Sequence, residues 1–258
     1  MAQIVRSEVE DIWGYAKRLR FVREVIRDFF TVDRRLKVLD LGCGNGSQLA
    51  IPLASDPRFE LTGIDPDAAS IDHARRLAAA RTNAKFVCGV IDELGPAARF
   101  DVVILSEVLE HLERPAEMLA SATRVLDRDG VLIVTVPNGY GEFEIDSWMF
   151  RSLRLQKLVD ALVTKREMIG STDNCESGHI QFFTRSRLRE LFRQAGLVIF
   201  REGAGSFLAG PIAGHFVARS RRLVDLNAAI TDRLPLVLAS GWYFALRRSE
   251  QLARETDK

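Results

Sequence analysis

Apolar residues follow two different periodicities along this chain. Short apolar runs alternate with segments in which apolar residues recur every three or four positions. Such runs predict buried strands, and such segments predict helices. One predicted strand begins at Lys37, and four others span 59–64, 85–88, 100–105 and 130–136. The predicted helices span 47–54, 67–80 and 107–112, and the last of these continues or restarts over 115–125. This alternation predicts right-handed βαβ crossovers, and hence a parallel sheet that is covered on both faces.

The flanking parts of the chain follow the same two patterns. Residues 4–30 carry a helical apolar stripe, and so do residues 184–196, where Thr184 is a good N-cap and Gly196 a stop signal. Apolar runs predict two more strands, over 197–201 and 242–247. Together with the five central runs, these make seven strands.

The strands and helices predict a single domain over residues 1–258. Residues 1–35 form an N-terminal helical segment, and residues 36–138 form the core. Two insertions, 139–178 and 206–235, follow the fifth and sixth strands. We expect them to form a lid over the substrate, with helices near 147–163 and 216–232.

Composition narrows the classes of protein that this chain can belong to. Its 258 residues are 47% hydrophobic and 28% charged, with a net charge of +1. These values exclude a disordered or collagen-like chain. The near-neutral charge disfavours nucleic acid as a partner without excluding it. Three widely spaced cysteines without a CxxC pair predict a reducing, cytoplasmic environment. No apolar stretch approaches the length of a membrane span.

A glycine-rich turn follows the first strand. Residues Val38–Gly46 read VLDLGCGNG, with glycines at 42, 44 and 46. Glycine permits a tight turn and the close approach of a ligand, and the next helix directs free N–H groups at the same place. The spacing GxGxG is neither the GxGxxG of dinucleotide-binding folds nor a phosphate-binding GxxxxGK[ST] loop.

Two aspartates accompany this turn. Asp65 ends the second strand, where a carboxylate can accept hydrogen bonds from both hydroxyls of a ribose. Asp40 lies near the end of the first strand, where it could hold the loop or meet an ammonium group. Asp65 also precedes a helix that starts with proline, so it could act as a cap.

Three segments, Val38–Gly46, 63–65 and 100–111, together resemble the class I S-adenosylmethionine-dependent methyltransferases. The resemblance implies a Rossmann-like α/β fold, with a seven-stranded, mostly parallel sheet, helices on both faces and a C-terminal antiparallel strand. It implies S-adenosyl-L-methionine as the cofactor. The implied cofactor-binding residues are Asp40, Gly42, Gly44, Gly46, Asp65 and Ser106.

The chain departs from this family's pattern after the third strand. The family often carries an acidic residue there that contacts the adenine amine. Val90 occupies that position, and Asp92 follows two residues later. Either Asp92 takes this role from a longer loop, or backbone groups do.

The segment after the fourth strand, SEVLEHL, carries candidate catalytic residues. On a helix, Glu107, Glu110 and His111 would share one face. Two carboxylates and an imidazole can hold Mg²⁺, Mn²⁺ or Fe²⁺, which would lower the pKa of an acceptor hydroxyl. Alternatively, His111 acts as a general base without a metal, or the acids only stabilise a helix N-terminus.

A second resemblance concerns the same segment. EVLEHL, the turn Val136–Asn138 and the run HIQFFT from His179 are similar to the small-RNA 3′-terminal 2′-O-methyltransferases. That similarity implies a metal held by Glu107, Glu110, His111 and His179. The same segments also resemble ubiquinone-type O-methyltransferases and bacterial small-molecule and glycan methyltransferases.

These resemblances predict an enzyme that methylates a hydroxyl group of a small molecule, sugar or glycan. Its mechanism would be a direct displacement assisted by His111, with Glu107, or by a divalent metal. One alternative is a metal-dependent RNA 2′-O-methyltransferase. Another is a catalytically silent, cofactor-binding scaffold. The oligomeric state does not follow from the sequence.

Overall fold

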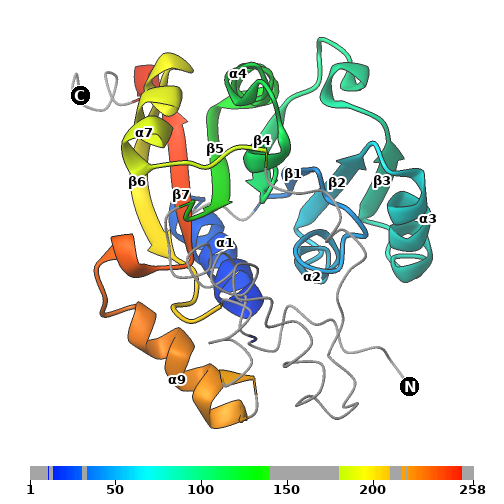
Figure 1. Cartoon of the computed structure of the whole chain (residues 1–258). Helices are drawn as coiled ribbons and strands as arrows, with labels where there is room; N and C mark the ends of the chain where they lie inside the picture. Colours follow the sequence, from blue (N-terminus) through cyan, green and yellow to red (C-terminus); the bar gives the residue numbers. More distant parts are fainter. Residues whose placement is uncertain are drawn as a thin grey trace.

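The computed structural model describes residues 11, 14–30, 34–139, 180–209, 217–218 and 220–251. Seven strands in these residues form one sheet, in the order β3-β2-β1-β4-β5-β7-β6 (Figure 1). The strands are β1 (Leu36–Leu41), β2 (Phe59–Asp65), β3 (Ala84–Cys88), β4 (Phe100–Ser106), β5 (Leu126–Pro137), β6 (Leu197–Ala204) and β7 (Gly241–Arg248).

The pairing of the strands matches the predicted fold class. Strands β1 to β5 pair in parallel with one another. The C-terminal strand β7 lies between β5 and β6 and runs antiparallel to both. The expectation of a mostly parallel, seven-stranded sheet with a C-terminal antiparallel strand is therefore confirmed.

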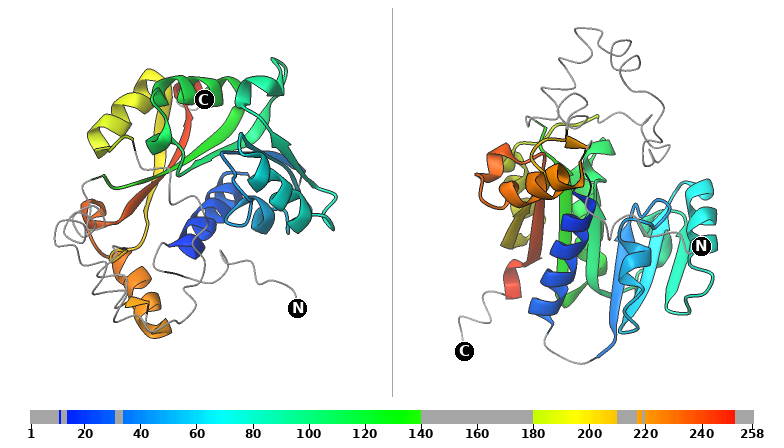
Figure 2. Two further views of the ribbon diagram at one scale, coloured as in Figure 1. Left: turned by 45° about the vertical axis from the view of Figure 1, so that its right-hand side comes forward. Right: turned by 90° about the horizontal axis from the view of Figure 1, so that it is seen from below.

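Helices cover both faces of this sheet (Figure 2). The α-helices are α1 (Tyr15–Phe29), α2 (Ala50–Leu53), α3 (Ala68–Leu77), α4 (Pro115–Val125), α7 (Arg185–Gln194) and α9 (Arg221–Thr231). The described residues also form three 3-10 helices, η2 (Ile91–Leu94), η3 (Leu109–His111) and η5 (Leu236–Leu238). Helices α1, α2 and α3 share one hydrophobic core with the sheet, and α4 and α7 share another.

Successive residues of the central strands enter opposite cores. Val38 and Ile104 pack on the side of α1, and Leu39 and Leu105 pack on the side of α4. Each of these four side chains is fully buried. Both faces of a strand must therefore be apolar, which explains why β1 and β4 appear in the sequence as continuous apolar runs.

One predicted helix is wrong, and a second is much shorter than expected. The helix expected from Glu107 does not begin there, because Glu107 has a φ of 55°, in the left-handed region. Its N–H donates to the carbonyl of Thr135, so this residue still extends the sheet. Only η3 follows, and α4 starts at Pro115. The helix expected over 47–54 is reduced to α2, because residues 47–49 form a turn.

Parts of the predicted organisation fall outside the described residues. These parts are residues 1–10, 12–13 and 31–33 of the N-terminal helical segment at 1–35, residues 140–178 of the first insertion with its expected helix near 147–163, and residues 210–216 and 219 of the second insertion at 206–235. The division into helical segment, core and lid therefore stays a prediction. Among the described helices, none is both long and apolar enough to cross a membrane.

Phe192 of α7 gives a test of the core on the α4 side. Its ring meets that of Phe244 edge to face at 5.3 Å, and its side chain is 1% exposed. Phe192→Ala should lower the free energy of unfolding by about 3–5 kcal/mol, because it leaves a cavity. Urea denaturation measures this loss. Phe200→Ala, at a 37% exposed position, is the control. An equal cost for both variants would contradict this account of the core.

Candidate active site

The glycines of the turn after β1 have different neighbours. A Cβ atom on Gly42 would lie 2.6 Å from Cγ2 of Val108, so packing within the protein requires glycine there. A Cβ atom on Gly44 would have no atom within 4 Å, although the φ of 52° still favours glycine. Gly44 therefore faces open space at the carboxyl end of β1, which is where ligands bind in open α/β sheets.

Asp65 joins this turn to the end of β2. Its Oδ2 accepts a hydrogen bond from the N–H of Gly44 at 2.8 Å, and its Oδ1 accepts one from the N–H of Asp67 at 2.9 Å. The helix cap of α3 is instead Asp67, whose carboxylate accepts from Ala69 and Ser70. Each oxygen of Asp65 keeps a second lone pair for a ligand.

Asp40 lies beneath the turn and is 3% exposed. Burial, together with the neighbouring charge of Asp65, raises the pKa of Asp40 to about 7. Hydrogen bonding to the backbone of Ala50 and the charge of Arg18 oppose this rise. The aspartate therefore exchanges its proton near neutral pH, and a nearby cation would favour its charged form.

Sequence analysis missed Arg18 of α1, which connects this turn to the end of β4. Its Nη1 donates to Oε1 of Gln48 at 3.2 Å and to Oγ of Ser106 at 3.3 Å, and its Nη2 lies 3.3 Å from Oε1 of Glu107. Burial alone would lower the pKa of Arg18, but the charge of Glu107 helps to hold it above its usual value. No local motif marks an arginine on a long amphipathic helix as part of a site.

A chain of hydroxyl groups continues from Arg18. Oγ of Ser106 lies 3.0 Å from Oγ1 of Thr135, and Thr135 donates to Oε1 of Glu107 at 2.8 Å. Since Arg18 donates to Ser106, the hydroxyl of Ser106 can in turn donate to Thr135. The predicted residues Ser106 and Glu107 thus meet in one network, and the buried Thr135 of β5 completes it.

One donor of Arg18 has no partner in the part of the chain that the structure describes. Its Nε–H is buried and makes no hydrogen bond there. An unmet buried donor is costly, and a charged guanidinium normally meets a carboxylate. The open space at Gly44, the carboxylates of Asp65 and Asp40 and the guanidinium of Arg18 together suit a ligand that carries a ribose, an ammonium and a carboxylate. S-adenosylmethionine carries all three.

Glu110 and His111 form a separate pair in η3. Glu110 is fully buried, and neither of its carboxylate oxygens receives a hydrogen bond within the described residues. Burial, with the charge of Glu107 adding to it, raises the pKa of Glu110 well above its ordinary value. Nε2 of His111 lies 3.9 Å from Oε1 of Glu110, and the imidazole is 33% exposed.

The predicted metal ligands are only partly brought together. Glu107 directs an oxygen toward Arg18 and Thr135, whereas Glu110 lies beside His111. Among the described residues, no group of three or more His, Cys, Asp or Glu is arranged to hold a metal ion. His179 lies outside those residues, so the four-ligand site stays a prediction. The next described residue, Ile180, donates its N–H to the carbonyl of Glu110.

Asp92 has another partner. It lies in η2, and its carboxylate forms an ion pair with Arg124 of α4 at 2.6 Å on the surface. Val90, at the position of the family's acidic residue, is 50% exposed. A contact between Asp92 and adenine therefore stays a prediction, and it would require this ion pair to open.

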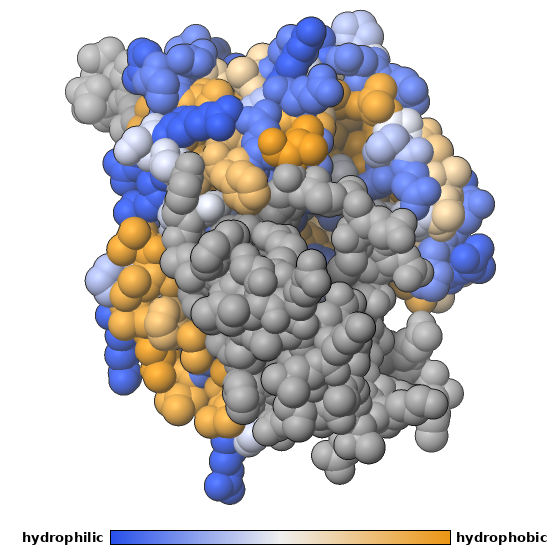
Figure 3. Space-filling model, in the orientation of Figure 1, coloured by the Kyte–Doolittle hydropathy of each residue, from blue (hydrophilic) through white to orange (hydrophobic). Residues whose placement is uncertain are grey.

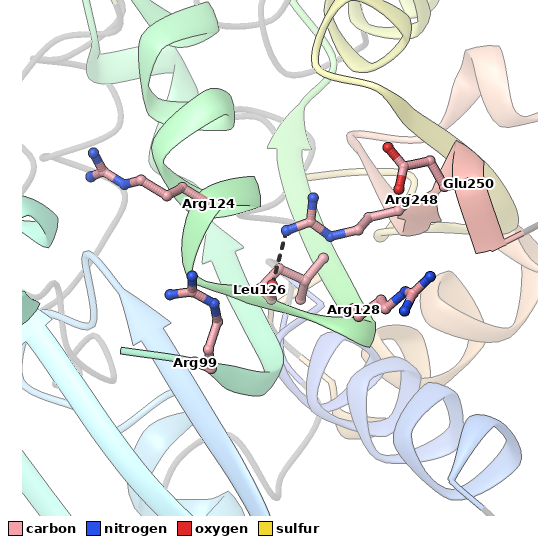
Figure 4. Close-up of a pocket in the computed structure, with 6 residues that line it drawn as sticks. All are labelled: Arg99, Arg124, Leu126, Arg128, Arg248 and Glu250. Carbon is pink, nitrogen blue, oxygen red and sulfur yellow. Dashed lines mark hydrogen bonds between the residues drawn. The ribbon is translucent and has the colours of Figure 1, made fainter. Parts of the chain in front are cut away.

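Two hollows in the described residues lie away from the glycine turn. The first, of about 300 Å³, is lined by Arg99, Arg124, Leu126, Arg128, Arg248 and Glu250 (Figure 4). Three of its arginines serve local contacts: Arg248 donates to the carbonyls of Thr123 and Leu126, Arg99 donates to two carbonyls, and Arg124 pairs with Asp92. The second, of about 670 Å³, lies between α1, α9 and β6.

Comparison with known families decides what kind of domain this is. The model of a family described as a methyltransferase domain matches residues 13–202, which is well over half of the chain. The chain belongs to this methyltransferase family. The match includes the glycine turn, Asp65 and the Glu110–His111 pair.

Related proteins agree with this assignment. Over 130 residues the methyltransferase is 35% identical to a ubiquinone biosynthesis O-methyltransferase from Azorhizobium caulinodans, covering 47% of this chain and 51% of the relative. The chain spans about half the length of the curated relatives that it matches.

Solved structures share the fold. Magnesium protoporphyrin IX methyltransferase from Synechocystis PCC 6803, solved with bound SAH, has a TM-score of 0.56 at 19% identity, covering 92% of this chain and 84% of that one. The [4+2]-cyclase SpnF has a TM-score of 0.57 at 19% identity, covering 88% and 80%. The expected methyltransferase fold is confirmed.

Asp40 makes the stability of this methyltransferase depend on pH. Because its pKa is about 7 in the folded chain instead of 3.8, the folded state retains a proton that the unfolded state loses. The contribution of Asp40 to the free energy of unfolding should therefore fall as the pH rises between these two values. Asp40→Asn should remove this fall, so that at the upper end of this pH range its free energy of unfolding exceeds that of the wild type by about 1–4 kcal/mol. Urea denaturation at several pH values measures the difference, and a difference that is constant with pH would contradict the prediction.

Proposed function

We propose that this protein transfers the methyl group of S-adenosylmethionine to a hydroxyl group of a small molecule, sugar or glycan. The observation that carries this proposal is the open glycine turn at Gly44, with the carboxylate of Asp65 bonded to it. Membership of the methyltransferase family supports it.

Each residue around the turn would bind a different part of the cofactor. Asp65 would hold the ribose hydroxyls, and Arg18 would hold the carboxylate of the methionine part. Asp40 in its charged form would balance the ammonium group. Backbone groups near Val90 would contact the adenine, because Asp92 is engaged by Arg124. When bound, S-adenosylmethionine supplies a methyl group on a positively charged sulfur.

His111 is the group that we assign to the proton of the acceptor. An alcohol is a weak nucleophile, so removing its proton during the transfer accelerates the reaction. Nδ1 of His111 is buried, which leaves Nε2 to take the proton. The carboxylate of Glu110, 3.9 Å from Nε2, would then stabilise the imidazolium. Burial keeps the pKa of Glu110 high, and a positive imidazolium beside it would lower that pKa again.

We assign Glu107 a positioning part, because it pairs with Arg18 and accepts a hydrogen bond from Thr135. Its expected catalytic part stays a prediction. Oxygen as the methylated atom is supported by the names of the relatives, which are ubiquinone biosynthesis O-methyltransferases. The match covers only about half of the length of those relatives, so the class of acceptor is part of the proposal and does not follow from their names.

The role of His111 can be tested with labelled cofactor. The protein is incubated with methyl-labelled S-adenosylmethionine and a fractionated cell extract, and label in the small-molecule and glycan fractions is followed. His111→Ala should lower the rate of transfer by about 10²–10⁴-fold, the usual worth of a general base. Calorimetry should find its affinity for S-adenosylmethionine unchanged.

His73→Ala is the matched control, because His73 is exposed on α3. It should transfer label at the wild-type rate. Full activity in His111→Ala would refute the assigned base. If the wild type binds the cofactor but transfers no label to any fraction, the result would favour a silent scaffold.

A metal-assisted version of the reaction is the second candidate. One observation favours it: Ile180 and Gln181 donate to the carbonyl of Glu110, so the residues that follow His179 are held at η3. The unpartnered, buried oxygens of Glu110 suit a divalent cation, and Glu107 would have to leave Arg18 to join it.

Removal of metal separates the two versions. If His111 acts alone, transfer should survive EDTA and dialysis, and His179→Ala should change the rate less than tenfold. If a metal takes part, EDTA should abolish transfer, and Mn²⁺ or Mg²⁺ should restore it. EDTA-sensitive label in the RNA fraction would instead support an RNA 2′-O-methyltransferase.

A further inference from the structure

Helix α9 has apolar side chains on both of its faces. Val224 and Ala228 face inward and are buried. On the outward face, Leu223, Leu226 and Ile230 are 45%, 53% and 39% exposed. A surface helix is normally polar on its outer face, because exposed apolar area is unfavourable in water. The outward face of α9 is therefore suited to contact with an apolar partner.

The apolar face extends to the next element. Val237 and Leu238 of η5 are 62% and 43% exposed. Figure 3 shows apolar residues gathered over η5 and α9, on the left-hand side of the molecule. We call Leu223, Leu226, Ile230, Val237 and Leu238 the outer patch. They account for five of the nine large hydrophobic residues that are exposed in the described part of the chain.

The outer patch is held rigidly to the sheet. Asn138, directly after β5, donates to the carbonyls of Val237 and Ala239, each at 2.9 Å. The buried Lys17 of α1 donates to the carbonyl of Ala228 and to Asp232. The patch therefore belongs to the same end of the sheet as the candidate site, because Asn138 follows the strand that carries Thr135.

The charges around the patch indicate what it meets. Arg222 lies at the start of α9 and Arg233 just after its end; both are exposed and have no partner among the described residues. Both acidic residues of this segment are already paired, Asp225 with Arg221 and Asp232 with Lys17. An apolar face with an unpaired cation at each end complements an anionic lipid surface.

The same charges disfavour a second copy of the chain. If two α9 helices met antiparallel, Arg222 of one would face Arg233 of the other, and a parallel pair would bring identical arginines together. Either arrangement places like charges side by side with no free carboxylate on α9 to balance them.

We propose that the outer patch docks the protein on an anionic bilayer, with the side chains of α9 and η5 in the interface and Arg222 and Arg233 among the headgroups. An acceptor with an apolar tail, held in that bilayer, would then lie on the side of the molecule that carries the candidate site. The placement of the acceptor rests on the proposed function, whereas the docking itself does not.

Sedimentation with lipid vesicles tests the docking. The full chain is spun with vesicles of phosphatidylcholine alone and of phosphatidylcholine mixed with phosphatidylglycerol. It should bind the mixed vesicles, and Leu226→Asn with Val237→Asn should weaken this binding by at least about tenfold. Arg222→Gln with Arg233→Gln should weaken binding to the mixed vesicles and leave the neutral ones unchanged.

Phe200→Asn is the matched control, because Phe200 is an exposed apolar residue outside the patch. It should bind like the wild type. Absence of vesicle binding, or equal binding by the patch variant, would overturn the proposal. So would a wild-type dimer, detected by light scattering, that the patch variant converts to a monomer. Affinity for S-adenosylmethionine should stay unchanged in every variant, so failure of the docking is distinguishable from failure of the proposed function.

Discussion

The buried charge of Arg18 is the interaction on which the candidate site depends. Removing a guanidinium from water costs several kcal/mol, and only well-placed partners offset that cost. Here the partners come from the turn after the glycines, through Gln48, and from the end of β4, through Ser106 and Glu107. The arginine therefore couples the position of α1 to the edge of the sheet where ligands bind. Its Nε–H is a buried donor with no partner among the described residues.

A left-handed backbone at Glu107 accompanies its contact with Arg18. A residue with a φ of 55° cannot continue into an α-helix, so the chain turns before η3. This turn directs Glu107 toward Arg18 and leaves Glu110 and His111 as a pair of their own. Such strain in a non-glycine residue is often retained at functional sites. The three residues that form one cluster in the sequence therefore divide into Glu107, which faces Arg18, and the Glu110–His111 pair.

The fold alone does not determine the chemistry. SpnF shares the architecture of this protein at a TM-score of 0.57, and it is a [4+2]-cyclase. Function must therefore be argued from the site. In this chain the site consists of the open space at Gly44, the carboxylate of Asp65 and the Glu110–His111 pair, which together support the proposed function. The outer patch of α9 and η5 adds a second surface, which the chemistry of methyl transfer does not require.

The sequence by itself determined the sheet, most of its helices and the glycine turn with Asp65. These features depend on local patterns: apolar runs for strands buried on both faces, and glycine where a side chain at Gly42 would strike Val108. Only the tertiary structure decided the contacts of Arg18, Thr135 and Glu107. Arg18 and Ser106 are 88 residues apart, and Thr135 and Glu107 are 28 apart. Contacts over such separations leave no periodicity in the chain, because they depend on how the elements pack against one another.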